Sequence, residues 1–367
     1  MHKKIFPIIF MFVLFFILLS SGCMDMVLDP STTYQAQPTK IRYDIRYGYT
    51  FYCNGSGEYE IHYRCDKPQV LNGLVSSLQK LYSEGGEDSV VAGNSVVVWN
   101  LSGTTANTYT LGISATIDKE SYLVSDLTGA NALTVSEIVS SYPDIVSEYG
   151  HTQAMDEIVY IDPTNADIKR TATEIQEQTK TTNAYMLAQS LFTWLKENTR
   201  YQIHEEQNGV QPAQTTYQIK TGDCDDLSIL YISLCRSVGV PARLIRGYLL
   251  EDISGTPIVG PHAWAEVFVG GTVGNNGWVP VECASTADNV QIEIHQNFGI
   301  EDVSHLRVYV DNGSNESLNS SYSSISWIYD PSMKISPSPF IEIENYVILE
   351  SKQLVVTKEG NRSYKST

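Results

Sequence analysis

Three residues in the middle of the chain have the types needed for nucleophilic catalysis: Cys224, His262 and Glu282. A cysteine attacks as the thiolate, and a neighbouring histidine can take up its proton and later return it. A carboxylate that accepts a hydrogen bond from the imidazole fixes its orientation. Together such groups would carry out acyl transfer through a thioester. The local sequence must then supply the elements that bring them together.

The segment around Cys224 predicts a helix with the cysteine in its first turn. Asp223 can cap the helix start, and a buried face is marked by Leu227, Leu230, Leu234 and Val238. The helix should end at Gly239 and Pro241. Its N-terminus would favour the thiolate. The neighbouring Asp223, Asp225 and Asp226 would oppose it wherever their carboxylates face the sulfur.

His262 begins a predicted strand in which polar or aromatic residues alternate with small apolar ones as far as Val269. A further strand is expected over Arg243–Leu250. A glycine-rich loop, Gly270 to Gly277, leads from the His262 strand to another over Trp278–Cys283. Folding this last strand back as a hairpin brings Glu282 within a residue or two of facing His262. Asp288 is a poorer candidate for the same role.

Other residues near these positions have structural interpretations. We expect Cys235 to lie in the helix core and Cys283 to pack on the face opposite Glu282. Trp264 and Trp278 could line an acyl pocket, although core packing is the commoner role of such aromatics. A zinc site made of Cys224, His262 and Cys283 would lack the short paired spacings of structural zinc. The sequence therefore predicts no metal and no cofactor.

Three strings of residues resemble the successive motifs of the transglutaminase-like superfamily. They are TGDCDDLSILYISLCRSVGVPARLIRGYL from Thr221, HAWAEVFV from His262 and GWVPVE ending at Glu282. The resemblance spans roughly residues 165 to 290 and implies a papain-like fold. It also implies a triad of nucleophile Cys224, base and acid His262, and orienting carboxylate Glu282, where aspartate is usual in the family. The flanking regions resemble exported prokaryotic members only loosely.

The whole chain has the pattern of an α+β protein with a papain-like core between β-rich flanks. We predict a signal peptide (1–22), a tether (23–40), a β-rich N-terminal domain (41–161), a catalytic domain (162–290) and a β-rich C-terminal extension (291–367). Helices are expected from Asp162, with Pro163 in the first turn, and along the apolar stripe from Ala184 to Leu195. The remaining strands are expected at Val96–Trp99, Tyr109–Ile117, Glu157–Ile161, Leu306–Val310, Ser326–Tyr329 and Tyr346–Val356.

A hairpin is predicted near the start of the N-terminal domain. Two alternating segments flank the turn-like string from Asn54 to Gly57. In that hairpin Cys53 and Cys65 would lie roughly 20 Å apart. A disulfide needs Cα atoms within about 7 Å, so unpaired thiols are favoured over a bond.

The N-terminus predicts export. Lys3 and Lys4 precede an apolar run from Ile5 to Leu19, and small residues then lead to Cys23. The small residues ending at Cys23 resemble the lipidation site of exported lipoproteins, which would anchor the chain to a membrane outside the cytoplasm; an uncleaved signal anchor is the alternative. Asn-x-Ser/Thr sequons, for example at Asn54 and Asn100, suit such a surface if the host glycosylates.

Charge and chemistry together limit the function. The net charge of −18 (24 basic against 42 acidic residues) disfavours nucleic acid as a partner. We expect acyl transfer at an amide of a protein or peptide substrate. Water as the acceptor would make the protein a protease or deamidase, and a lysine amine would make it a crosslinking transglutaminase. Hydrolysis is favoured because water is abundant. A non-catalytic surface module on the same fold is the rival class.

Overall fold

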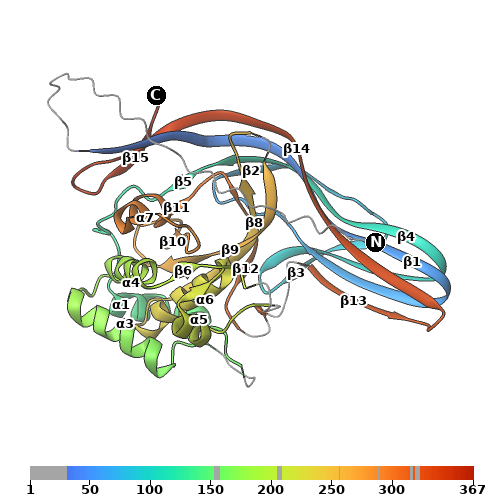
Figure 1. Cartoon of the computed structure of the whole chain (residues 1–367), viewed down its shortest axis with the longest axis horizontal. Coiled ribbons are helices and arrows are strands. Elements are labelled where there is room, and N and C mark those ends of the chain that lie inside the picture. Colours follow the sequence, from blue (N-terminus) through green and yellow to red (C-terminus); the bar gives the residue numbers. More distant parts are fainter. Residues whose placement is uncertain are drawn as a thin grey trace, which may run out of the picture.

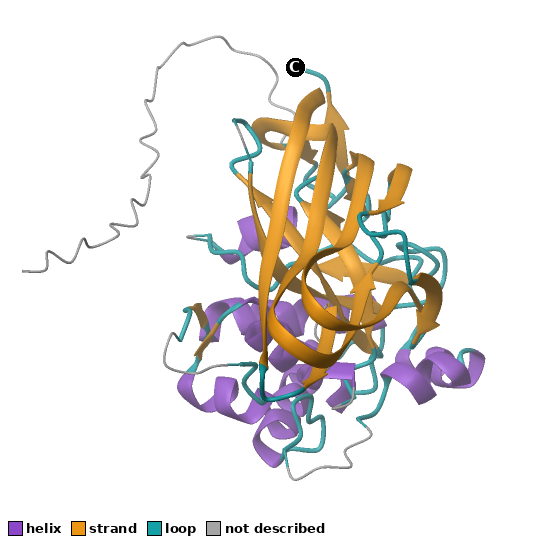
Figure 2. Cartoon of the chain, turned by 90° about the vertical axis from the view of Figure 1, so that its right-hand side faces the viewer, coloured by secondary structure: helices purple, strands orange, loops and turns teal. Residues whose placement is uncertain are grey.

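The computed structural model describes residues 31–152, 158–204, 209–255, 257–287, 289–314, 317–318 and 323–367. A helical layer, a four-stranded sheet and a long, curved seven-stranded sheet lie one upon another (Figures 1 and 2). This is the mixed α+β architecture expected from the sequence. The predicted catalytic domain, residues 162–290, supplies most of the first two layers.

The long sheet is built mainly from three strands, β1 (Thr32–Asp66), β4 (Asn94–Glu120) and β14 (Met333–Val356). β4 pairs along one side of β1, and β14 followed by β13 (Ser323–Tyr329) pairs along the other, all antiparallel. The shorter strands β2 (Gly73–Lys80), β3 (Gly86–Val91) and β15 (Arg362–Lys365) complete it. The first and last parts of the chain therefore share one sheet.

The predicted hairpin at Asn54–Gly57 is wrong, because β1 runs unbroken through these residues for 35 residues. Gly55 and Gly57 have φ values of +114° and +143°, and the register against β4 shifts on both sides of Ser56. The two halves of β1 pair with β4, β13 and β14 and not with each other, although the strand bends between them and brings the Tyr63 ring within 5.6 Å of Tyr49. Cys53 and Cys65 form no disulfide.

The four-stranded sheet has the order β10–β9–β8–β12 and is antiparallel. Its strands are β8 (Ala242–Glu251), β9 (Ile258–Phe268), β10 (Trp278–Val281) and β12 (His305–Asp311). The first three match the predicted strands to within a few residues. β12 was expected in a separate C-terminal extension, yet it forms an edge of this core sheet.

The helices cover one face of this sheet. They are α1 (Val135–Ser141), α2 (Pro143–Tyr149), α3 (Ala166–Thr179), α4 (Ala184–Asn198), α5 (Ala213–Ile219), α6 (Cys224–Ser237) and α7 (Val290–Asn297). Short strand pairs join β5 (Tyr122–Leu123) to β11 (Ile300–Glu301) and β6 (Arg200–Tyr201) to β7 (Thr221–Gly222). The predicted helices at α3, α4 and α6 are present.

Each face of the four-stranded sheet contributes to a different core. Ala263, Ala265 and Val267 of β9 pack with α4 and α6 in an aliphatic core. The opposite face sends Tyr248 and Leu306 into a second core, which is rich in tyrosines from β1 and β4. The sheet is therefore buried on both faces, and the long sheet supports it from behind.

Several predicted boundaries differ from the observed elements. The predicted tether reaches Lys40, but β1 already begins at Thr32 because this segment pairs with the end of β14. The strand expected at Glu157–Ile161 is absent from its described part, residues 158–161. α3 begins at Ala166 with Asn165 as its cap, after Pro163. The helices α1 and α2 lie inside the region predicted as β-rich.

The signal peptide and Cys23 fall outside the described residues. Within the residues that the structure describes, no helix is long and apolar enough to cross a membrane.

Candidate active site

α6 presents Cys224 at its very first residue, as the cap pattern predicts. Asp223 occupies the N-cap, and its backbone N–H donates to the Asp226 carboxylate at 3.2 Å. Buried residues follow along the helix from Asp226 to Arg236. The helix is thus anchored in the aliphatic core while its N-terminal cysteine stays partly exposed.

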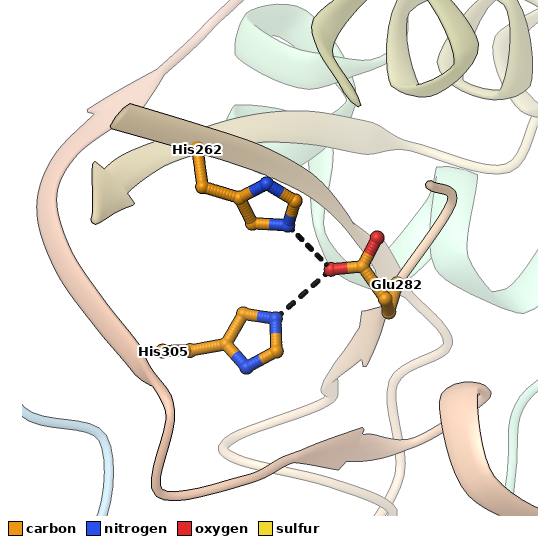
Figure 3. Close-up of side chains that lie close together, drawn as sticks. All are labelled: His262, Glu282 and His305. Carbon is orange, nitrogen blue, oxygen red and sulfur yellow. Dashed lines mark hydrogen bonds and ion pairs between the residues drawn. The ribbon is translucent and has the colours of Figure 1, made fainter. Parts of the chain in front are cut away.

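The β9–β10 hairpin brings His262 and Glu282 together. Val281 pairs with Ala265, so Glu282 follows the last paired residue at the end of β10 that lies toward His262. His262 Nε2 and Glu282 Oε2 are 2.7 Å apart (Figure 3). Because a carboxylate only accepts hydrogen bonds, Nε2 carries the proton of this hydrogen bond. The juxtaposition predicted from the hairpin is therefore present.

The sulfur of Cys224 lies beside the start of this same strand. The backbone N–H of Ala263, the residue after His262, lies close enough to the sulfur to lower the pKa of the thiol. Cys224, His262 and Glu282 all line one pocket of about 400 Å³. The structure thus gathers the three residues chosen from the sequence at a single site.

The charges around Cys224 oppose thiolate formation. Burial raises the pKa of the Cys224 thiol, Asp225 and Asp223 raise it further, and the Ala263 N–H lowers it. Asp226 is held elsewhere, because its carboxylate accepts from the backbone N–H of Gln211 at 2.7 Å and also from its side-chain amide. The sequence-based concern about neighbouring aspartates therefore applies to two of the three.

Glu282 is held on both carboxylate oxygens. Oε1 accepts from the backbone N–H of Ala284 at 2.6 Å, and Oε2 accepts from two histidines, His262 and His305. Burial alone would raise the pKa of Glu282, but the interactions with the two histidines lower it well below its ordinary value. Glu282 is thus an ionised carboxylate, while the alternative, Asp288, lies outside the described residues.

His305 is a member of the site that the sequence analysis missed. Its Nε2 lies 2.9 Å from Glu282 Oε2, and its Nδ1 lies 2.8 Å from Asp302 Oδ1 (Figure 3 shows the Glu282 contact). Burial would lower the pKa of His305, but Asp302 and Glu282 raise it to about 10. One signal was available, because His305 begins an alternating strand, β12, much as His262 precedes its own alternating segment.

The two tryptophans belong to the core. Trp264 is buried behind the site, where its ring stacks on His262 at 6.0 Å and meets His305 edge-on at 4.9 Å. Its Nε1 donates to Glu301 at 3.3 Å. Trp278 packs on Phe268. Neither lines the pocket, so the core interpretation holds for both.

The other cysteines are also structural. Cys235 and Cys283 are free and buried in the aliphatic core. Among the described residues, two groups could bring three ligand atoms within 4.8 Å of one another: His262 with Glu282 and His305, and the aspartates 223, 225 and 226. The contacts of the first group are hydrogen bonds that a triad needs.

Comparison with known proteins identifies the domain that carries this site. Residues 169–283 match the model of the transglutaminase-like superfamily. The chain therefore contains a transglutaminase-like domain, as its three motifs imply. The match includes Cys224, His262 and Glu282 and ends before His305.

Solved structures resemble this chain to different degrees. One is a protein from Cytophaga hutchinsonii provisionally described as a cysteine protease, which is 15% identical with a TM-score of 0.52 over 91% of this chain and 100% of that one. The periplasmic domain of TgpA from Pseudomonas aeruginosa is 11% identical with a TM-score of 0.33, over 70% and 93% of the two chains. Red sea bream transglutaminase is 8% identical with a TM-score of 0.27, over 84% and 78%. No curated protein matches the sequence.

Proposed function

We propose that this protein is a thiol-dependent enzyme that hydrolyses amides in proteins or peptides through a Cys224 thioester. One observation carries the proposal: the Cys224 sulfur lies against the N–H of Ala263, next to a His262–Glu282 pair joined at 2.7 Å in the same pocket. A cysteine, an imidazole and an orienting carboxylate in this order are what acyl transfer requires.

Each residue has a defined part in the reaction. His262 takes the thiol proton, and the thiolate forms a bond to the carbonyl carbon of the amide. The C–N bond then breaks, and His262 gives its proton to the departing amine, which leaves the acyl group on sulfur. Water, deprotonated by His262, attacks the thioester, releases a carboxylic acid and restores the thiol. The backbone N–H of Cys224 at the start of α6 can stabilise the oxyanion.

The shape of the site supports a polypeptide substrate. The pocket around Cys224 adjoins a second hollow of about 640 Å³, and Tyr201 and Ser285 line both. An extended chain could therefore occupy both hollows. We favour water as the acceptor because the pocket is open to solvent; a lysine acceptor would instead make the enzyme a crosslinking transglutaminase.

Alkylation tests the nucleophile without a known substrate. Iodoacetamide should modify Cys224 faster than a free thiol at pH 6 to 7, with the site read by peptide mass spectrometry. The cysteines 53, 65, 235 and 283 are buried and supply internal controls. A rate no greater than that of a free thiol across pH 5 to 8 would refute an activated nucleophile and favour a non-catalytic binding module.

The reaction itself is tested with denatured proteins as substrates. Mass spectrometry should read cleavage, deamidation and crosslinks in the same sample. We expect cleavage or deamidation that disappears in the Cys224→Ala variant. Crosslinks without hydrolysis would reassign the enzyme as a transglutaminase.

We also propose that the mature protein is a lipoprotein held at a membrane outside the cytoplasm through Cys23. The support is the sequence from Lys3 to Cys23, which has the order of a basic region, an apolar run and small residues. The Cys23→Ser variant should leave the membrane fraction of cells. Continued membrane association of this variant would favour an uncleaved signal anchor.

A further inference from the structure

We infer that His305 is a positioning residue that holds Glu282 for His262 and supplies a fixed positive charge to the site. The inference rests on the proposed function, since it assigns a part to the same triad. It adds a fourth side chain, from a strand beyond the matched domain.

The geometry by itself defines the protonation state of His305. Both of its ring nitrogens lie within hydrogen-bond distance of carboxylate oxygens, Nδ1 of Asp302 at 2.8 Å and Nε2 of Glu282 at 2.9 Å. Ionised carboxylates only accept hydrogen bonds, so each nitrogen must carry a proton. His305 is therefore an imidazolium, in contrast to His262, which needs a proton only on Nε2 to bond Glu282.

The surroundings of His305 sustain this charge. Its own loop supplies Asp302 and Ser304, the segment after β10 supplies Glu282, and β9 supplies the rings of His262 and Trp264. Behind Trp264 lies Glu301, which is itself paired with Lys119 of β4. Glu251 of β8 lines the same pocket. The carboxylates in contact with His305 outweigh its burial, in agreement with a pKa of about 10.

His262 and His305 share one oxygen of Glu282, and this contact affects the triad. Glu282 Oε2 accepts from both histidines while Oε1 is held by Ala284, so the carboxylate is fixed at both ends. The imidazolium also offsets part of the negative charge that Glu282 and Asp223 place around the sulfur, and that Asp225 adds once it is ionised. Removing a positive charge makes every nearby deprotonation harder. His305 thus favours the thiolate that the aspartates disfavour.

The first test observes the wild-type protein directly. The chain has seven histidines, and ring-15N labelling with NMR gives a titration for each. His305, assigned from the His305→Gln spectrum, should keep both ring nitrogens protonated at pH 8 and lose one near pH 10. A neutral His305 ring at pH 7 would overturn the inference. If His305→Gln does not fold, Asp302→Asn supplies the assignment, because it should lower the His305 titration.

The second test measures Cys224 alkylation against pH in wild type, His305→Gln and His305→Leu. Glutamine keeps a donor to Glu282 without the charge, and leucine removes both. We expect the acid limb of the profile to move up by roughly one to two pH units in His305→Gln, and the rate to fall further in His305→Leu. His62→Gln is the control, because His62 is an exposed residue of β1 that does not line the pocket.

The outcomes separate the two proposals. If wild-type Cys224 is activated and His305→Gln gives the same profile, the role of His305 is refuted and the proposed function stands. If wild-type Cys224 is not activated, the proposed function fails, and the NMR titration still decides the charge of His305. If both variants lose the same share of the Cys224 alkylation rate while the acid limb stays at its wild-type pH, His305 has a purely structural role. That result would also overturn the inference.

Discussion

The matched domain and the long sheet differ in how far apart in sequence their partners lie. Cys224, His262 and Glu282 fall within 59 residues of one another, on elements that contact each other directly. In the long sheet, Thr32 pairs with Val356 at the opposite end of the chain. The reacting groups therefore lie on elements that are close in sequence. The long sheet that supports these elements depends on strand pairings between the two ends of the chain.

A buried ionic cluster joins the two regions. Lys119 of β4 is fully buried and contacts Glu301 at 2.5 Å, and Glu301 also pairs with Arg307. Arg307 reaches Glu266 of β9 at 2.8 Å. Since Trp264 donates to Glu301 and stacks on His262, this cluster links the long sheet to the back of the active site.

Glu282→Gln should have the largest effect on chemistry. An amide can present a donor to a histidine and cannot carry the charge that steadies an imidazolium. We expect turnover to fall by about 10²- to 10⁴-fold. The assay is cleavage or deamidation of the identified substrate, with thermal unfolding to check the fold. Unchanged turnover would remove Glu282 from the triad.

Lys119→Met should have the largest effect on the stability of the fold. It leaves Glu301 buried with one cationic partner fewer, at a cost of about 3–5 kcal/mol in the free energy of unfolding. Lys40→Met is the matched control, because Lys40 is an exposed lysine in a loose pair with Glu120 and should change stability by less than about 0.5 kcal/mol. Urea unfolding measures both. Equal stability of the two variants would show that the cluster does not hold the regions together.

Acid should weaken the same buried ionic cluster. The pKa of Glu301 is lowered to about 2 from 4.5, because Arg307 and Lys119 outweigh its burial, and that of Glu266 is lowered as well. A depressed carboxyl pKa stabilises the fold above the unfolded value and loses this contribution as pH falls. Urea unfolding from pH 6 down to pH 3 should therefore show stability falling below about pH 4.5. A shallower fall is expected in Lys119→Met; identical slopes would assign the acid response to other groups.

Asp225→Asn should have a smaller effect on stability, and it should raise stability instead of lowering it. Burial and Asp223 raise the pKa of Asp225 to about 8 from 3.8, so Asp225 is mostly protonated at neutral pH in the folded state, and burying it there costs stability. A raised carboxyl pKa means that stability declines as pH rises from the unfolded to the folded value. The variant should be more stable at pH 8 by about 1–2 kcal/mol, discounted for its partial exposure. It should also speed Cys224 alkylation, and no change in either measurement would mean that Asp225 is well solvated.

The sequence predicted the helices α3, α4 and α6, the strands β8 to β10 and the position of Cys224 at a helix start. Each depends on periods and caps that extend over a few residues, so neighbouring side chains contain the information. The proximity of His262 and Glu282 was also predictable, because a hairpin with a short glycine-rich loop restricts the register. At Asn54–Gly57 the turn-forming residues mark a bend within one strand, and the predicted pairing was wrong because the partners of both halves are remote in sequence.

The sequence by itself therefore determined the class of domain and its three principal side chains, since these lie on adjoining elements with strong local patterns. Only the tertiary structure decided that β12 completes the core sheet, that His305 shares an oxygen of Glu282, and that Lys119 supports the site from the long sheet. These contacts join residues 23 and 182 positions apart in the chain. No local sequence pattern predicts contacts between residues so far apart in the chain, because such contacts depend on which faces of separate layers pack together.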